Sequence, residues 1–411
     1  MNTSGLVSAA DRTRQLLEGL LRRPLPLRLR AWDGSEAGPL GGPTLVVSNR
    51  RALRRLLWQP GELGLARAYV SGDIGVDGDL YEALEALSSL IWEPLPVRGK
   101  EIRAAIGSLV RLGVIGPPPP RPKEEITVSG ARHSKARDRQ AVSHHYDVGN
   151  DFYRLVLGPT MVYSCALWTS GEAPGYGLDT AQQDKLALIC RKLELKPGQR
   201  LLDVGCGWGG LAIHAARHHG VTVVGVTISE TQAEYARKQV AEAGLSDMVE
   251  IRHQDYRDVR VDPVDAIASV GMGEHVGREH YADYARTLHG LLKPGGRLLN
   301  QQIASLWSVS RGSRRTFIDA YVFPDGELDR VGVTVARFED AGFEVRSVEA
   351  MREHYGPTLR AWVRNLQDDW DRAVALTSPG RARVWLLYMA ACALGFERRQ
   401  FGVNQILAVR A

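Results

Sequence analysis

The stretch LLDVGCGWGG, residues 201–210, decides the fold that the sequence predicts. An apolar run ends in Asp203, and Gly205, Gly207 and Gly209 then permit a tight turn before a helix-like segment. Glycines in such a turn let backbone N–H groups approach a ligand closely. The GxGxG spacing differs from the GxGxxG of dinucleotide-binding proteins, and no Gly-Lys-Ser/Thr of a phosphate-binding loop follows it. A structural turn that binds no ligand is the alternative interpretation.

Strands and helices alternate around this loop. The strand-like runs are residues 199–206, 221–228, 249–255, 264–272 and 297–303. The helix-like runs are residues 210–220, 229–244 and 279–292, with Ser229 as the N-cap of the second and Lys-Pro-Gly-Gly ending the third. This alternation predicts an α/β domain with a mostly parallel sheet and helices on both faces.

A carboxylate and an imidazole follow the fourth of these strands, in the stretch GMGEHVG. Solvated loop residues are one interpretation. Ligands of parallel sheets, however, bind beyond the carboxyl ends of the strands. We therefore expect Glu274 to belong to a site and His275 to support the turn that carries it.

Four consecutive prolines in GVIGPPPPRPKEE, residues 113–125, mark a domain boundary because they cannot lie inside a helix or a central strand. We predict a linker over residues 116–128. Residues 1–115 form a small α+β domain, with helices at 8–23, 49–58 and 79–93, and residues 129–411 form the α/β domain.

Composition is that of a soluble globular protein, with 44% hydrophobic and 24% charged residues in a chain of 411. No uncharged apolar stretch is long enough to span a bilayer, and the N-terminus lacks the pattern of a signal peptide. The four cysteines show no CxxC spacing. They predict free thiols in a reducing cytosol and no metal site.

Charge is concentrated near the N-terminus, where residues 1–60 hold ten Arg and four acidic residues, which gives an excess of +6. This excess suits an anionic partner, either nucleic acid or an acidic membrane surface, and a solvated basic face is the alternative. Basic residues alternate there with Leu rather than with aromatic residues. That pattern favours an interfacial amphipathic helix over a platform on which bases stack.

A resemblance to a known family accounts for these motifs together. The glycine loop resembles the S-adenosylmethionine loop of class I methyltransferases. Six segments are similar, in the same order, to those of cyclopropane-fatty-acyl-phospholipid synthases: SHHYDVGNDFYRLVLGPTMVYSCALW, LLDVGCGWGG, VTISETQ, QDYRDV, GMGEHVG and FIDAYVFPDGEL. The similarity runs from about residue 130 to the C-terminus. LGLARAYVSGDI is similar to part of the family's smaller domain, which is associated with membranes.

The resemblance implies a Rossmann-like class I methyltransferase fold and S-adenosylmethionine as the cofactor. The residues that it implies for cofactor binding are Tyr163, Ser164, Asp203, Gly205, Gly207, Trp208, Thr227, Gln232, Asp255 and Tyr256. Thr227 and Gln232 stand where many methyltransferases have a carboxylate for the ribose. Tyr146 and Tyr355 are implied for the substrate pocket.

The chemistry that the resemblance implies is a methyl transfer to an alkene. The double bond of an acyl chain attacks the methyl group of the sulfonium, and the resulting carbocation then loses a proton. In the family a bicarbonate ion takes that proton. The residues implied to hold it are Cys165, Glu274 and Tyr321, with the backbone near Ile303.

One position departs from the family pattern, because Gln301 stands where most members have a His that helps to hold bicarbonate. An amide can donate a hydrogen bond but cannot carry charge or a proton. Several C-terminal segments are closer to a subgroup that makes methylene-branched chains, which a flavin-dependent reductase converts to 10-methyl chains. We therefore predict a methylene product, with cyclopropane formation as the alternative if Gln301 still supports bicarbonate.

The predicted partner is a phospholipid membrane, with the protein cytoplasmic and peripheral at the inner face of the cell membrane; a homodimer remains open. Two hypotheses of other kinds are a lipid-binding protein with a vestigial cofactor fold and an RNA methyltransferase. Intact Gly205, Gly207 and Glu274 disfavour the first. The second lacks an Asn/Asp-Pro-Pro-Tyr-type motif, so we expect no nucleic-acid partner.

Overall fold

The computed structural model describes residues 7–92, 107–146, 148–171, 173–306 and 315–411. The chain divides into two compact units. Unit 1 comprises residues 1–126, 313–322 and 378–394, and unit 2 comprises residues 127–312, 323–377 and 395–411.

Unit 1 therefore differs in extent from the N-terminal domain that the sequence predicted. Its N-terminal part continues through the proline stretch to Ile126, and two later segments join it. Backbone contacts show why, since Ile126 N–H donates to Ala320 O at 2.7 Å. Phe317 N–H likewise donates to a Glu62 carboxylate oxygen at 2.9 Å. Such contacts between distant segments leave no mark in the local sequence pattern.

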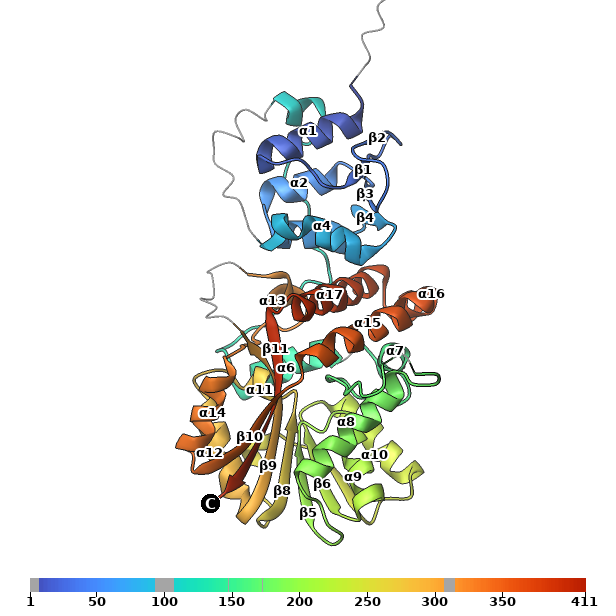
Figure 1. The fold of residues 1–411 in the computed structure, drawn as a ribbon. Helices are drawn as coiled ribbons and strands as arrows, with labels where there is room; N and C mark the ends of the chain where they lie inside the picture. Colours follow the sequence, from blue (N-terminus) through green and yellow to red (C-terminus); the bar gives the residue numbers. More distant parts are fainter. Residues whose placement is uncertain (1–6, 93–106, 147, 172, 307–314) are drawn as a thin grey trace, which may run out of the picture. The chain divides into compact units, whose positions relative to one another are not determined.

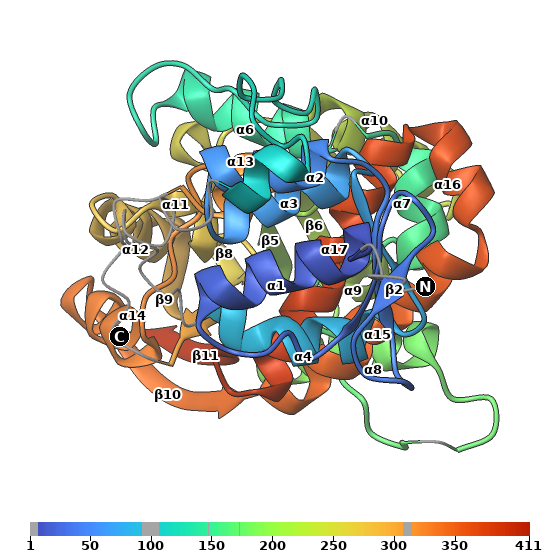
Figure 2. The ribbon, with the colours of Figure 1, turned by 90° about the horizontal axis from the view of Figure 1, so that it is seen from above.

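Unit 2 is built on one sheet of seven strands in the order β10-β11-β9-β8-β5-β6-β7. Figures 1 and 2 label all of these strands except β7. The strands are β5 (Arg200–Val204), β6 (Thr222–Thr227), β7 (Val249–His253), β8 (Val264–Val270), β9 (Leu292–Ser305), β10 (Phe343–Ala350) and β11 (Phe401–Arg410). Strands β5 to β9 pair in parallel, whereas β11 pairs antiparallel with both β9 and β10. The predicted fold class and its five strands are confirmed, and the antiparallel pair was not predicted.

Helices cover both faces of this sheet (Figure 1). Helices α8 (Leu178–Lys192), α9 (Gly210–His219) and α10 (Glu230–Glu242) share one apolar core with the sheet. Helices α12 (Tyr281–Leu291) and α14 (Val331–Asp340) form the other core. Ser229 caps α10, because its side chain accepts a hydrogen bond from Gln232 N–H, as predicted.

The remaining described elements of unit 2 lie in its connections. They are α6 (Lys135–Tyr146), α7 (Asn150–Leu157), the 3₁₀ turn η1 (Tyr256–Asp258), α11 (Gly273–Val276), α15 (Arg352–Asp368) and α16 (Trp370–Leu376). Helix α12 ends at Leu291, just before the Lys-Pro-Gly-Gly segment that was predicted to end it. That segment lies in strand β9, which therefore begins earlier than predicted.

Unit 1 contains a small sheet in the order β2-β1-β3-β4. Its strands are β1 (Arg28–Arg30), β2 (Glu36–Ala37), β3 (Thr44–Val47) and β4 (Ile74–Asp77), and its helices are α1 (Ala9–Leu21), α2 (Arg51–Trp58), α3 (Glu62–Val70), α4 (Leu80–Trp92), α13 (Phe317–Tyr321) and most of α17 (Pro379–Glu397). The three predicted helices are present, and α3 was missed.

The N-terminal basic segment packs into unit 1 and forms ion pairs there, which the sequence pattern did not predict. Helix α1 buries Ala10 and Leu16 in the apolar cores of unit 1, so its apolar face is occupied rather than free for a membrane interface. Five of the ten arginines form ion pairs among the described residues: Arg14, Arg28, Arg30, Arg51 and Arg55. In the part of the chain that the structure describes, no helix could cross a membrane.

Candidate functional site

The glycine loop after β5 adopts a backbone that only glycine accepts easily. Gly205, Gly207 and Gly209 have φ values of 80°, 54° and 85°. The N–H groups of Gly205 and Cys206 both donate to Val226 O, which holds the loop over the end of β6. The loop then leads directly into α9.

An open cavity of about 1480 Å³ lies at this loop, at the carboxyl ends of β5, β6 and β8. Its lining includes every residue that the sequence implied for the cofactor, together with Tyr146: Tyr163, Ser164, Asp203, Gly205, Gly207, Trp208, Thr227, Gln232, Asp255 and Tyr256. Glu274, Cys165, Gln301, Ile303, Tyr321 and Tyr355 lie outside that lining. The structure thus gathers the residues implied for the cofactor around one cavity, and Ser164 and His275, the chain neighbours of Cys165 and Glu274, also line it.

The polar residues after β6 and β7 are held in place by their neighbours. Thr227 Oγ1 donates to Gln232 Oε1 at 2.8 Å, so these two side chains form one polar edge of the cavity. Asp255 forms an ion pair with Arg257 at 2.6 Å, and Arg257 also contacts Asp138. The cavity wall at this end is therefore preorganised.

Sequence reasoning missed a buried lysine in the same cavity. Lys185 on α8 is 1% exposed and donates from Nζ to Ser164 Oγ at 2.8 Å. Burial lowers its pKa to about 7. The same effect raises the pKa of buried Asp203 to about 7 against the opposing attraction of Lys185, and Asp203 Oδ2 has no hydrogen-bond partner among the described residues. A signal existed, because Lys185 lies four residues from both Ala181 and Ile189 on the buried face of α8.

Lys185 and Asp203 stand apart from the other charges that line the cavity. The lining residues Asp138, Asp255 and Asp325 are ion-paired with arginines. Within the described residues, neither Lys185 nor Asp203 has a partner of opposite charge within 4.0 Å. A buried cation and a buried anion in one cavity match the two ends of a zwitterionic amino-acid group.

Glu274 occupies the first turn of α11, directly after β8. Its Oε1 accepts from Ile303 N–H at 2.7 Å. That N–H needs a partner because β8 pairs with β9 only as far as Val270, opposite Gln301. Glu274 Oε2 is buried and has no hydrogen-bond partner among the described residues. Burial raises the pKa of Glu274 to about 7, and the Ile303 bond opposes that rise.

A chain of backbone contacts connects Cys165 with Glu274. The Cys165 thiol contacts Met351 O at 3.7 Å, and Met351 N–H donates to Val403 O at 2.8 Å. Val403 of β11 lies opposite Ile303 of β9, whose N–H binds Glu274. Cys165 is 1% exposed, and burial raises the pKa of its thiol. The thiol is therefore a neutral donor.

The two tyrosines that the sequence singled out lie in different units. Tyr355 follows Met351 on the first turn of α15, and its ring packs on Phe396 at 4.5 Å. Tyr321 belongs to unit 1, where burial and then Glu125 raise the pKa of its phenol and Arg67 opposes the rise. The phenol on the element that binds Cys165 is thus Tyr355, which the sequence had assigned to the substrate pocket.

Gln301 is buried in the sheet and takes part in a polar relay. Its Oε1 accepts from Gln405 Nε2 at 2.9 Å, and Gln405 Oε1 accepts from Lys192 Nζ at 2.7 Å. This relay fixes the orientation of the Gln301 side-chain amide, so that its NH₂ group can donate a hydrogen bond to another group.

Aromatic rings gather beside the cavity. Tyr146 packs edge to face on Trp208 at 5.6 Å, and Tyr163 lies 5.3 Å from Trp362. Burial and then the negative charge of Glu274 raise the pKa of Tyr146. Burial lowers the pKa of His275 to about 4, so this imidazole is neutral and suits the supporting role predicted for it.

Comparisons with known proteins identify relatives of the chain. Residues 133–406 match the family model described as Mycolic acid cyclopropane synthetase. The chain is 44% identical to a probable fatty acid methyltransferase of Mycobacterium tuberculosis, over 94% of this chain and 91% of the relative. It is 34% identical to the cyclopropane-fatty-acyl-phospholipid synthase of Escherichia coli, over 89% and 87%. A solved mycolic acid cyclopropane synthase complexed with SAH and CTAB is 33% identical, with a TM-score of 0.62, over 66% of this chain and 98% of that chain.

Replacing Lys185 by Met tests the place of the amino-acid end of the ligand. We expect the affinity for S-adenosylhomocysteine to fall roughly tenfold or more, because a hydrogen bond to a charged group contributes about 1.5–3 kcal/mol. Methylthioadenosine lacks the amino-acid end and should keep its affinity. Titration calorimetry measures both, with Lys238→Met, an exposed substitution on α10, as the control. Equal losses for the two ligands would contradict the assignment.

Proposed function

Because this chain belongs to the mycolic acid cyclopropane synthetase family, we propose that it adds one carbon from S-adenosylmethionine to the cis double bond of acyl chains in membrane phospholipids, with a methylene-branched chain as its product. Its family makes it an S-adenosylmethionine-dependent methyltransferase that acts on fatty acyl chains. The proposal adds the lipid class, the position of attack and the product.

The cavity suits the cofactor of the family. Bound S-adenosylmethionine supplies an electrophilic methyl group. Asp203 and Lys185 offer charges for its amino-acid end, and the hydroxyl of Thr227 with the amide of Gln232 offers polar contacts for a sugar. Glycine N–H groups in the loop after β5 allow a ligand to approach the backbone closely.

Aromatic side chains favour a cationic reaction. An alkene that takes up a methyl group becomes a carbocation on the acyl chain. Tyr146, Tyr163 and Trp208 line the cavity, and ring faces attract a desolvated cation by about 1–2 kcal/mol each. The cavity surroundings can therefore stabilise this charge without placing a nucleophile beside it.

The observation that carries the proposal is the half-satisfied carboxyl of Glu274. One oxygen is fixed by Ile303 N–H and the other is buried without a partner among the described residues. A buried carboxyl group with a pKa of about 7 exists in both protonation states near neutral pH. It can therefore donate a hydrogen to a small anion or accept one, and the reaction needs such a group where the carbocation loses its proton.

Bicarbonate fits this position as a proposed co-reactant. Glu274 Oε2 would share a hydrogen with it, and Tyr355 would donate to it. The Cys165 thiol would donate as well on turning away from Ala166 O and Met351 O, which it contacts in this structure. The backbone help expected from Ile303 is not free in this structure, because that N–H is already bound by Glu274. An anion bound here would therefore receive its hydrogen bonds mainly from side chains, and less from the backbone than the resemblance implied.

The methylene product is favoured over a cyclopropane by the side chain at position 301. Ring closure depends on rapid proton removal from the transferred methyl group, and the amide of Gln301 cannot take up or deliver that proton. A slower proton loss leaves time for a hydride shift in the cation, after which loss of a proton from the methyl carbon gives a methylene branch. A flavin-dependent reductase is the proposed partner that would reduce this alkene.

The proposed site of action is the inner face of the cell membrane. In unit 1, Trp58, Val110 and Ile115 are 54%, 57% and 57% exposed. Trp58 Nε1 donates to Gly116 O, which places Trp58 beside the 115–116 segment. Exposed apolar side chains next to basic residues such as Arg111 suit a phospholipid surface. A homodimer is compatible with this proposal but is not required by it.

Replacing Glu274 by Gln tests the carboxyl itself. The amide can still accept from Ile303 N–H, so the fold and the cofactor cavity should persist. We expect turnover to fall at least about 100-fold, which is a typical loss for a group that handles a proton. Cofactor affinity should stay within about twofold of wild type. Methyl transfer from labelled cofactor to mono-unsaturated phospholipid vesicles measures the first quantity and calorimetry the second, with exposed Glu279→Gln as the control. A matching loss of cofactor affinity would make Glu274 a binding residue instead.

Two single substitutions decide which phenol serves the site. We expect Tyr355→Phe to lower turnover roughly tenfold or more, because it removes the hydroxyl and keeps the ring that packs on Phe396. Tyr321→Phe should leave turnover close to wild type, because the described neighbours of that phenol belong to unit 1. The same vesicle assay measures both. The reverse result would restore Tyr321 to the set that the sequence implied.

The product is tested by mass spectrometry of fatty acids from a host that lacks this chemistry and expresses the wild type or Gln301→His. We expect methylene-branched chains from the wild type. The substitution should shift the product toward cyclopropane and increase the stimulation of the purified enzyme by added bicarbonate. Cyclopropane alone from the wild type would refute the methylene assignment, and unmodified chains from a folded, cofactor-binding protein would refute the proposed function.

A further inference from the structure

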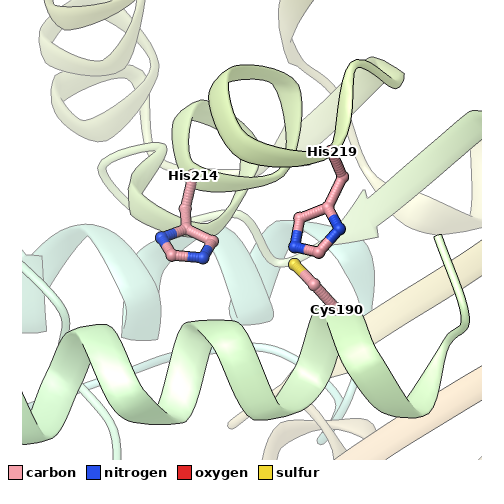
Figure 3. A group of neighbouring side chains, drawn as sticks. All are labelled: Cys190, His214 and His219. Atoms are coloured by element: carbon pink, nitrogen blue, oxygen red, sulfur yellow. The ribbon is translucent and has the colours of Figure 1, made fainter. Parts of the chain in front are cut away.

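A cysteine and two histidines meet between helices α8 and α9, outside the cavity described above. Figure 3 shows Cys190 on α8 facing His214 and His219, both on α9. One ligand atom from each residue lies within 4.8 Å of the other two. None of the three lines the cofactor cavity. The sequence predicted no metal site, because the cluster combines two helices and shows no metal-binding spacing along the chain.

The hydrogen bonding of His214 leaves one ring nitrogen available. Its Nδ1 lies 3.0 Å from Gln183 Oε1, an atom that can only accept. Nδ1 therefore carries the proton, and Nε2 keeps its lone pair. Histidines that bind metals commonly donate their other ring N–H to an oxygen in this way. Burial, followed by His218 and His219, lowers the pKa of His214 to about 4, so the imidazole is neutral at pH 7.

The thiol of Cys190 can bind a metal once it has lost its proton. Cys190 is fully buried, and burial raises its pKa to about 12. The thiol is free and forms no disulfide. A bound divalent cation would displace its proton, because thiolate rather than thiol binds metals.

We propose that Cys190, His214 and His219 form a binding site for a divalent metal of the zinc class. One thiolate and two neutral imidazoles are ligands that Zn²⁺ prefers, and water would complete a tetrahedron. Zinc–ligand bonds of about 2.0–2.3 Å imply ligand atoms roughly 3.5 Å apart. The ligand atoms lie within 4.8 Å of one another, so a bound metal would draw them about 1 Å closer together. On binding, one thiol proton passes to solvent and three protein–metal bonds form.

The site would join two helices that carry parts of the cofactor cavity. Helix α8 bears Gln182 and Lys185, which bond to Val162 O, Ser164 O and Ser164 Oγ in the cavity wall. Helix α9 begins directly after the glycine loop. A metal at their far ends would restrain both helices without touching the ligand of the cavity.

Cobalt titration of the full-length, reduced protein tests the proposal. Co²⁺ bound to thiolate and imidazole gives a sulfur-to-metal charge-transfer band and strong visible bands, and Zn²⁺ should abolish both at one equivalent per chain. We expect Cys190→Ser to remove the charge-transfer band. The partly buried His219→Gln should weaken binding at least about 100-fold while leaving the fold intact. The melting temperature should rise with Zn²⁺ in the wild type and not in these variants.

Two control variants make the result specific. Cys392→Ser removes another thiol whose pKa burial raises to about 12, in unit 1, and should keep the charge-transfer band. His218→Gln removes the exposed neighbour of His214 and should also keep it. A wild type without a charge-transfer band, or a band that survives Cys190→Ser, would overturn the proposal. Loss of binding in His218→Gln but not in His219→Gln would overturn this ligand set. The measurement needs no methyl transfer, so its outcome is independent of the proposed function.

Discussion

The hydrogen bond from Ile303 N–H to Glu274 Oε1 is the contact on which the site depends. Strand β9 continues to Ser305, but its pairing with β8 ends at Val270 opposite Gln301. The longer strand exposes an N–H inside the protein, and leaving it unpaired would cost about 1–3 kcal/mol. Glu274 Oε1 removes that cost, because it accepts a hydrogen bond from this N–H. The other oxygen is then buried without a fixed partner, and its group acquires a pKa near neutrality. The difference in strand length thus fixes the position of the carboxyl group, while burial raises its pKa against the opposing effect of the Ile303 bond.

The buried charges of the cofactor cavity follow a related principle. Lys185 and Asp203 are both withdrawn from water, and burial shifts both pKa values toward 7. Desolvation of an unpaired charge is expensive, so each side chain gains when a ligand brings the opposite charge. Protein stability alone would favour apolar side chains at these positions. Their presence therefore favours ligand binding, and Lys185 also donates a hydrogen bond to Ser164, the residue before Cys165.

The sequence predicted what local patterns encode. The glycine loop, the five parallel strands and the Ser229 cap could be predicted because each follows from residues within one or two turns of chain. Contacts between segments that lie far apart in the sequence could not be predicted in this way. Strands β10 and β11 pair with each other across some fifty residues, and α13 and most of α17 belong to unit 1. The site shows the same division: Glu274 was placed at a strand end correctly, whereas Lys185 and the Cys190 cluster required knowledge of which helix faces pack together.

The relay through Gln301 is the physical basis of the methylene product that we propose. Lys192 donates to Gln405, and Gln405 donates to the carbonyl oxygen of Gln301, so a cation polarises the amide and fixes its orientation. The NH₂ group that remains can donate a hydrogen bond to an anion but cannot act as a base. An imidazole in its place could accept the bond from Gln405 through one nitrogen and carry a proton on the other. Gln301 can therefore bind an anion as a histidine would, but it cannot transfer a proton. In the reaction that we propose, proton removal is left to Glu274 and to the anion that it would hold, and a slower proton loss gives the carbocation more time to rearrange.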